Sequence, residues 1–218
     1  MIGSRKAPAA KRSDDAENPF WISFSDLMTA LMVLFLVAMA VALMNVTQGL
    51  RKMNESRTTR EQAISSCLAD VEQLTQQAPF TGVKLRGQTL ELGTLAEFKK
   101  DGNELPPQRM AFLRSFVPQM LRVAQTPSCQ PWLKRFVLEG YASPEGSYLY
   151  NLNLSLERSQ RVLCVLLDAT APDAPSWEER KAIRKMFFVG GSSFNSAILN
   201  QPEKSRRVEL RLEFKDQS

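Results

Sequence analysis

The sequence predicts a single transmembrane helix, a coiled-coil-like linker helix and then an α/β (α+β) domain with a mixed sheet. Three observations support this fold class. An apolar run extends from Phe20 to Met44. A polar stretch without proline but with a heptad pattern follows it over residues 46–77. Beyond Pro79, apolar residues alternate in some segments and recur with a helical period in others, which is typical of packed helices and strands.

The membrane helix is expected over residues 19–45, after a disordered cytoplasmic tail (1–18). A transmembrane helix needs about 20 predominantly apolar residues, and no charged residue lies between Asp26 and Arg51. Asn18 and Pro19 are typical of a helix start. The apolar run is too long for a cleavable signal peptide, and no small-residue cleavage site follows it.

Asp26 stands near the start of this apolar run. An ionisable side chain inside a membrane is costly, so it indicates a proton or ion relay, a partner charge or a water-filled path. The alternative is a carboxylate in the headgroup region that caps the helix. Trp21 precedes Asp26, and aromatic residues mark the membrane interface. Ser25 and Thr29 add a polar strip, which favours a proton-carrying Asp26 with these two residues as pore-lining support.

The orientation of the span is not decided by its flanking charges, because basic residues lie on both sides of it. They are Arg5, Lys6, Lys11 and Arg12 before the span, and Arg51, Lys52, Arg57 and Arg60 after it. The short tail and the large C-terminal part fit a cytoplasmic N-terminus. One span cannot form a channel alone, so this chain must pair with itself or with another membrane protein if Asp26 lines a path.

A linker helix with a dimer seam is expected over residues 46–78. Apolar and other residues recur seven apart, with a second set interleaved four residues on, and the two sets are Val46, Met53, Arg60, Cys67, Leu74 and Leu50, Arg57, Ile64, Val71. The alternative is a plain amphipathic linker. Because Cys67 lies on the seam, two copies could form a Cys67–Cys67 bridge.

The folded domain is expected over residues 79–218, where strands and helices follow one another. The expected strands are a hairpin within 83–93, then 134–141, 187–189 and 206–214. The expected helices begin at Pro106–Pro107 and cover 152–167 and 177–186. Cys129 precedes one strand and Cys164 lies late on the helix that returns antiparallel to it. We therefore expect a Cys129–Cys164 disulfide, with free, buried thiols as the alternative.

Composition argues against several classes of function. The chain has no histidine, which removes the commonest general base and metal ligand, and no cysteine pair has metal-site spacing. The net charge of +5 is spread along the chain, without a basic run interleaved with aromatics, so direct nucleic-acid binding is not expected. No nucleophile–base pair or phosphate loop is present, and we expect neither an enzyme nor a cofactor or metal.

Two segments in the C-terminal half resemble OmpA-like, peptidoglycan-binding domains. They are EGYASPEGSYLYNLNLSLERSQRV (139–162) and SRRVELRL (205–212). The resemblance covers roughly residues 81–214. It implies a peptidoglycan site at Ala142, Ser143, Tyr150, Asn151, Leu154 and Arg158. The family's aspartate falls on Ser143, which supplies no charge, and Glu145 is the nearest substitute. Arg158 is expected to hold a carboxylate of the peptide stem, with an exposed helix arginine as the alternative.

The span resembles that of MotB-type stator subunits, in which an aromatic residue is followed by a pattern like Ser25-Asp26-Leu27-Met28-Thr29-Ala30. Within that group, the NPFWISFSDLMTALMVLFLVAM head, the continuous linker and the SPEG loop resemble the ZorB family of Zorya anti-phage defence systems. The resemblance implies a proton-driven homodimer inside a ring of a larger MotA/ZorA-like membrane subunit. It also implies a single-pass inner-membrane topology with a periplasmic C-terminal domain bound to peptidoglycan.

Two other functions remain open from the sequence. One is a flagellar MotB-type stator subunit, which shares the mechanism. The other is a passive peptidoglycan-anchored membrane protein without ion flux, in which Asp26 only pairs with a partner. The ion could be a proton or sodium, and the single membrane carboxylate favours the proton.

Overall fold

The computed structural model describes residues 18–198 and 200–216. The chain forms two compact units, Met1–Ser56 and Arg57–Ser218. The division falls within a helix, whereas the sequence placed the start of the folded domain after residue 78. Almost all of the predicted disordered tail (1–18) lies outside the described residues.

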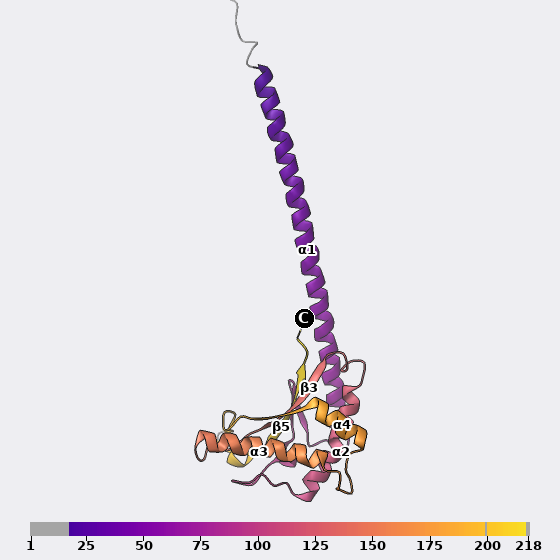
Figure 1. The fold of residues 1–218 in the computed structure, drawn as a ribbon, viewed down its shortest axis with the longest axis vertical. Coiled ribbons are helices and arrows are strands. Elements are labelled where there is room, and N and C mark those ends of the chain that lie inside the picture. Colours follow the sequence, from indigo (N-terminus) through magenta and orange to yellow (C-terminus); the bar gives the residue numbers. More distant parts are fainter. Residues whose placement is uncertain (1–17, 199, 217–218) are drawn as a thin grey trace, which may run out of the picture. The chain divides into compact units, whose positions relative to one another are not determined.

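A single α-helix replaces the two helices expected from the sequence. Helix α1 spans Asn18–Gln76, a length of 59 residues (Figure 1). It ends just before Pro79, since the residue before a proline avoids the helical conformation and proline cannot continue the helix. The predicted membrane segment and linker are therefore parts of one unbroken helix.

The heptad positions of α1 divide into two groups. Val46, Leu50 and Met53 are exposed, whereas Cys67 and Val71 are completely buried in the core of the folded unit. The sequence prediction of a dimer seam is therefore wrong from Cys67 onward, because this part of the apolar stripe packs against its own chain. Of the apolar heptad positions before Cys67, Ile64 also packs against this core, whereas Val46, Leu50 and Met53 are exposed.

The folded unit contains a five-stranded mixed sheet, as predicted. The strand order is β1-β2-β5-β3-β4, with β3 and β4 parallel and every other neighbouring pair antiparallel. The strands are β1 (Lys84–Arg86), β2 (Thr89–Glu91), β3 (Leu133–Gly140), β4 (Phe187–Gly191) and β5 (Val208–Phe214). Alternate residues of β5 face the core, which confirms the alternation seen in the sequence.

Three longer helices pack with this sheet (Figure 1). They are α2 (Pro107–Ala124), α3 (Tyr148–Leu167) and α4 (Trp177–Met186). Helix α3 begins earlier than expected because Ser147 caps it, its hydroxyl accepting a hydrogen bond from the Tyr150 amide at 3.3 Å. A short 3₁₀ turn (Gly93–Ala96) and the short helix α5 (Pro202–Ser205) were not predicted.

Two glycines bring α3 against the ends of the parallel strands. Gly140 and Gly191 are paired across β3 and β4. A Cβ atom at Gly140 would lie 1.9 Å from the Ser155 carbonyl oxygen, and one at Gly191 would lie 2.7 Å from the Ser155 hydroxyl. The absence of side chains at these glycines therefore fixes the position of α3, whose first turns adjoin the loops that leave both strands.

A disulfide joins the end of α1 to the segment between α2 and β3. It links Cys67 to Cys129, with the two Cα atoms 4.8 Å apart. The predicted Cys129–Cys164 pair is wrong, because Cys129 faces α1 whereas Cys164 is an exposed free thiol. A Cys67–Cys67 bridge is excluded in this oxidised state. Beside the disulfide, Asp70 Oδ2 accepts hydrogen bonds from the Thr126 and Ser128 hydroxyls, the second at 2.5 Å.

Candidate functional site

The first candidate site is the carboxylate of the apolar half of α1. Asp26 and its neighbours Ser25 and Thr29 are exposed along the helix, as are the apolar side chains that follow them. The Thr29 hydroxyl donates to the Ser25 carbonyl oxygen at 2.7 Å, one turn earlier. This hydrogen bond uses the hydroxyl proton of Thr29. The hydroxyl oxygen of Thr29 therefore remains available to accept a proton or a hydrogen bond beside Asp26.

This helix is long and apolar enough to cross a membrane, and its most apolar window is not buried inside the chain. Between Glu17 and Arg51, Asp26 is the only charged residue of the sequence. Trp21 and Phe24, whose rings meet edge to face with centroids 6.4 Å apart, lie on the N-terminal side of it. Such aromatic residues favour the interface, which places the carboxylate on the apolar side of them.

The second candidate site lies where β3 ends and α3 begins. Ala142 and Ser143 are buried there. The Ala142 amide donates to the Ser193 carbonyl oxygen at 2.8 Å, and the Ser143 hydroxyl donates to Glu145 Oε2 at 3.0 Å. Ser143, which takes the position of the family's aspartate, therefore orients the carboxylate of Glu145 instead of presenting one.

Asn151 holds this loop from inside, and Leu154 is buried on the same helix. Asn151 is buried, and its amide nitrogen donates to the carbonyl oxygens of Glu145 and Ser147 at 2.8 and 3.2 Å. Leu154 is also buried. Asn151 therefore holds the loop in place, and neither of these two predicted site residues presents a polar group to solvent.

An exposed rim surrounds these buried residues. Tyr150 is 48% exposed, and its hydroxyl donates to Asp101 Oδ1 at 3.1 Å. This hydrogen bond raises the pKa of the Tyr150 phenol. Lys100 Nζ lies 3.8 Å from Glu145 Oε2. Lys100, Asp101, Glu145 and Tyr150, which we call the rim, thus bring both signs of charge together at the surface.

Lys100 and Asp101 were missed by sequence reasoning. They belong to a loop far from the recognised motifs in sequence, and only the Asp101-Gly102 pair indicates a turn there. The turn requires an unusual backbone at Asp101, whose φ is 53°. An open pocket of about 890 Å³ adjoins this loop, and its lining also includes Pro107, Arg109 and Glu157.

Arg158 lies beneath the rim and is completely buried, so the alternative of an exposed helix arginine is wrong. Its Nε donates to the Gly102 carbonyl oxygen at 3.0 Å, Nη1 to that of Tyr141 at 2.9 Å and Nη2 to that of Lys99 at 3.1 Å. Burial, followed by the nearby charge of Arg206, lowers the pKa of the guanidinium to about 10, so it stays charged at neutral pH.

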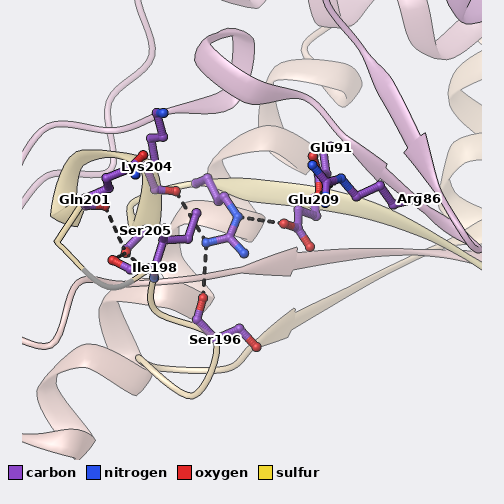
Figure 2. A network of polar contacts seen from close by, with 9 residues as sticks. Arg86, Glu91, Ser196, Ile198, Gln201, Lys204, Ser205 and Glu209 are labelled. Carbon is purple, nitrogen blue, oxygen red and sulfur yellow. Dashed lines mark hydrogen bonds and ion pairs between the residues drawn. The ribbon is translucent and has the colours of Figure 1, made fainter.

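The second recognised motif, Ser205–Leu212, closes the domain. Arg207 Nε lies 2.6 Å from Glu209 Oε1, and its Nη1 donates to the carbonyl oxygens of Ser196 and Lys204, both at 3.4 Å (Figure 2). The Ser205 hydroxyl accepts a hydrogen bond from the Ile198 amide at 2.8 Å. These contacts fasten the loop before β5 to the sheet, so the motif stabilises the fold.

Tyr141 connects this network to the second site. The guanidinium carbon of Arg207 lies 4.4 Å from the centre of the Tyr141 ring. Burial, together with the charges of Glu209 and Glu139, raises the pKa of the Tyr141 phenol to about 12. Tyr141 therefore stays neutral and serves the fold, while its carbonyl oxygen is held by Arg158.

Comparison with known proteins connects both sites to one group. The family described as membrane MotB of the proton-channel complex MotA/MotB matches residues 4–56. The Zorya protein ZorB of Escherichia coli O139:H28 (strain E24377A / ETEC) is 40% identical over 98% of this chain and 88% of its own length. ZorB of Escherichia coli strain ATCC 8739 is 26% identical over 91% of this chain and 89% of its own length.

Among solved structures, the OmpA-like domain of FopA1 from Francisella tularensis aligns over 64% of this chain and 90% of its own, with 18% identity and a TM-score of 0.41. The periplasmic domain of Helicobacter pylori MotB (residues 78–256) aligns over 62% and 82%, with 12% identity and a TM-score of 0.42. The full-length identity to the Escherichia coli O139:H28 protein establishes the relationship: the chain belongs to the ZorB family of Zorya proteins.

Proposed function

We propose that this chain is the proton-carrying, wall-anchored subunit of a stator-like membrane complex in Zorya anti-phage defence. One observation carries the proposal: a relative named ZorB matches nearly the whole chain, and the segment that matches MotB contains Asp26, which is the only charged residue of the sequence between Glu17 and Arg51. The family resemblance supplies the defence role, and the chemistry of Asp26 supplies the proton step.

In the proposed mechanism, two copies place their α1 helices inside a ring formed by a larger MotA/ZorA-like membrane subunit. Asp26 takes up a proton from one side and releases it to the other. The neutral acid tolerates the apolar surroundings better than the carboxylate, so protonation changes which surface of the ring the helix prefers. Ser25 and Thr29 provide oxygen atoms beside the carboxylate that accept hydrogen bonds along the path.

The C-terminal domain would hold the complex in place by binding peptidoglycan. The rim offers carboxylates for an amine of the peptide stem and Lys100 for a carboxylate, so it suits a zwitterionic ligand. This arrangement implies an inner-membrane protein with a cytoplasmic N-terminus and a periplasmic domain. We propose no enzymatic activity, cofactor or nucleic-acid contact for the chain itself.

The first test is phage plaquing on cells that carry the whole operon with Asp26→Asn. The variant keeps the shape of the side chain but cannot titrate, so we expect protection to fall to the level of cells without the operon while the complex is still recovered. Asp26→Glu retains a titrating group and serves as the matched control, which should keep part of the protection.

The outcomes separate the three functions. Full protection by Asp26→Asn would reject the proton step and leave the passive wall anchor. Absence of protection in the wild type, together with rescue of swimming in cells that lack a flagellar stator subunit, would favour the flagellar alternative. Loss of the complex itself in Asp26→Asn would make Asp26 an assembly residue and equally reject the proposed role.

A further inference from the structure

Three polar side chains share one face of α1 near the start of its apolar part. Ser23, Asp26 and Thr29 are each three residues apart, and residues at this spacing are neighbours on a helix, with Cβ atoms about 5–6 Å apart. Helical side chains lean toward the N-terminus, so the carboxylate of Asp26 leans toward Ser23. Ser25 is adjacent to Asp26 in sequence but lies about 100° away around the helix. Ser23, which was not predicted as a site residue, is therefore closer to the face of the carboxylate than Ser25 is.

Hydroxyl groups are concentrated around Asp26 in this part of the helix. From Ala30 to Met44 the sequence contains no residue with a polar side chain. The next hydroxyl on α1 is that of Thr47, beyond this apolar stretch. A hydroxyl group in apolar surroundings is costly unless it makes a hydrogen bond, so each of these groups needs a partner.

The two threonines find their partners within the helix. The Thr29 hydroxyl donates to the Ser25 carbonyl oxygen at 2.7 Å, and that of Thr47 donates to two carbonyl oxygens one turn earlier, both at 2.9 Å. The Ser23 hydroxyl, by contrast, makes no hydrogen bond within the part of the chain that the structure describes. Ser23 therefore combines an unused donor with a position on the face of Asp26.

The two hydroxyls that flank Asp26 differ in what they can offer it. A hydroxyl group has one proton to donate and lone pairs that accept. The proton of Thr29 is engaged, so Thr29 can only accept, and only the protonated acid has a proton to donate to it. The proton of Ser23 is not engaged, so Ser23 can donate to the ionised carboxylate and form the stronger, charge-assisted hydrogen bond.

We infer that Ser23 is a further positioning residue of the proton step: its hydroxyl donates to Asp26 in the ionised form, whereas Thr29 accepts from Asp26 in the protonated form. The inference rests on the proposed proton-carrying role of Asp26. On release, the O–H bond of the acid breaks and its proton passes to water in the path, while the hydroxyl proton of Ser23 stays on Ser23. On uptake, a proton from water restores the acid O–H, which then donates to Thr29. The two hydroxyls thus stabilise opposite states of one carboxylate.

The test measures the protonation of Asp26 in the complex recovered from cells that carry the whole operon. Dicyclohexylcarbodiimide reacts with protonated carboxylic acids, so the fraction of Asp26 that it labels, read by peptide mass, should fall as the pH rises. Ser23→Ala removes the donor to the carboxylate and should move the midpoint of this fall up by about one pH unit. Thr29→Val keeps the shape of the side chain but removes the acceptor, and should move the midpoint down by about half a pH unit.

Thr47→Val is the matched control for Thr29→Val. It removes the same kind of intrahelical hydrogen bond beyond the apolar stretch, and it should leave the midpoint of Asp26 labelling unchanged. Thr29→Ser keeps a hydroxyl oxygen at the same position and should retain the wild-type midpoint. If Thr47→Val shifts the midpoint as much as Thr29→Val does, the effect comes from the helix as a whole and the inference fails.

Two further outcomes would overturn the inference. An unchanged midpoint in Ser23→Ala would show that no hydrogen bond from Ser23 reaches the carboxylate. A shift in the same direction in Ser23→Ala and Thr29→Val would show that the two hydroxyls do not stabilise opposite states. If wild-type Asp26 is not labelled, or is labelled equally at every pH, the proposed proton step itself is rejected, and this result would be seen before any variant is compared.

Discussion

The two parts of helix α1 carry similar apolar side chains, but these are exposed in the first part and buried near the end of the second. Before Ser56, apolar side chains such as Leu50 are exposed, while after Arg57 the equivalent heptad position, Val71, is completely buried. The helix itself does not change, since its hydrogen bonding continues from Asn18 to Gln76. What differs is the surroundings of the side chains, since Val71 packs in the core of its own chain and Leu50 is exposed.

A helical period of apolar residues therefore predicts that one face of the helix is buried. It does not identify which residues or molecules cover that face. The heptad spacing extends through both parts and is interrupted by Arg57 and Arg60. The sequence prediction favoured pairing with a second copy, with a plain amphipathic linker as the alternative. The structure identifies what covers the later positions, because Cys67 is bonded to Cys129 of the same chain.

The largest effect is expected from placing the same polar residue in both parts. Val71→Asn puts an amide into an apolar site without room for water, and should lower the free energy of unfolding of the domain by roughly 3 kcal/mol or more. Leu50→Asn should change it by less than about 0.5 kcal/mol. Urea unfolding of the full-length chain in detergent measures both, and equal losses would show that the two parts are not energetically separate.

Removal of the disulfide should have the next largest effect. The double variant Cys67→Ser/Cys129→Ser frees the end of α1 from the segment before β3, and the domain should lose about 2–5 kcal/mol. Cys164→Ser is the matched control, because this cysteine is free and exposed, and it should unfold like the wild type. A double variant as stable as the control would mean that packing and the Asp70 hydrogen bonds alone hold α1 in place.

The smallest effect concerns Tyr141 and appears only at alkaline pH. Its pKa is raised from 10.0 to about 12 in the folded chain. Stability from the neutral phenol is therefore complete below pH 10 and is lost as the pH rises toward 12, with a total of roughly 2.7 kcal/mol. The slope of unfolding free energy against pH in this window should be reduced in Tyr141→Phe, and an unchanged slope would show that another group causes the loss.

Much of the fold could be predicted from the sequence because its signals are local. The strict alternation of β5, the capped start of α4 and the long apolar run of α1 each depend on neighbouring residues. The mixed sheet was predicted correctly for the same reason. The disulfide pairing could not be predicted in this way. It depends on how the end of α1 packs against the segment between α2 and β3, and no local sequence pattern indicates that packing.

The candidate wall site was predicted only in part. Tyr150 lies on the exposed rim, whereas Ser143, Asn151 and Leu154 are buried, and the first two of these make hydrogen bonds within the loop. The rim also includes Lys100 and Asp101, which a loop distant in sequence brings to Glu145 and Tyr150. A sequence motif identifies which residues belong to a site. It does not distinguish the residues that contact a ligand from those that stabilise the loop between β3 and α3.

If the folded domain is periplasmic, as proposed, formation of the Cys67–Cys129 bond depends on the export of this domain. The two cysteines are 62 residues apart, so the second must leave the ribosome and reach an oxidising compartment before the bond can form. A copy inserted the wrong way round would keep its domain in the reducing cytosol and remain uncrosslinked. Under the proposed topology, the bond would therefore be present only in copies whose folded domain has been exported.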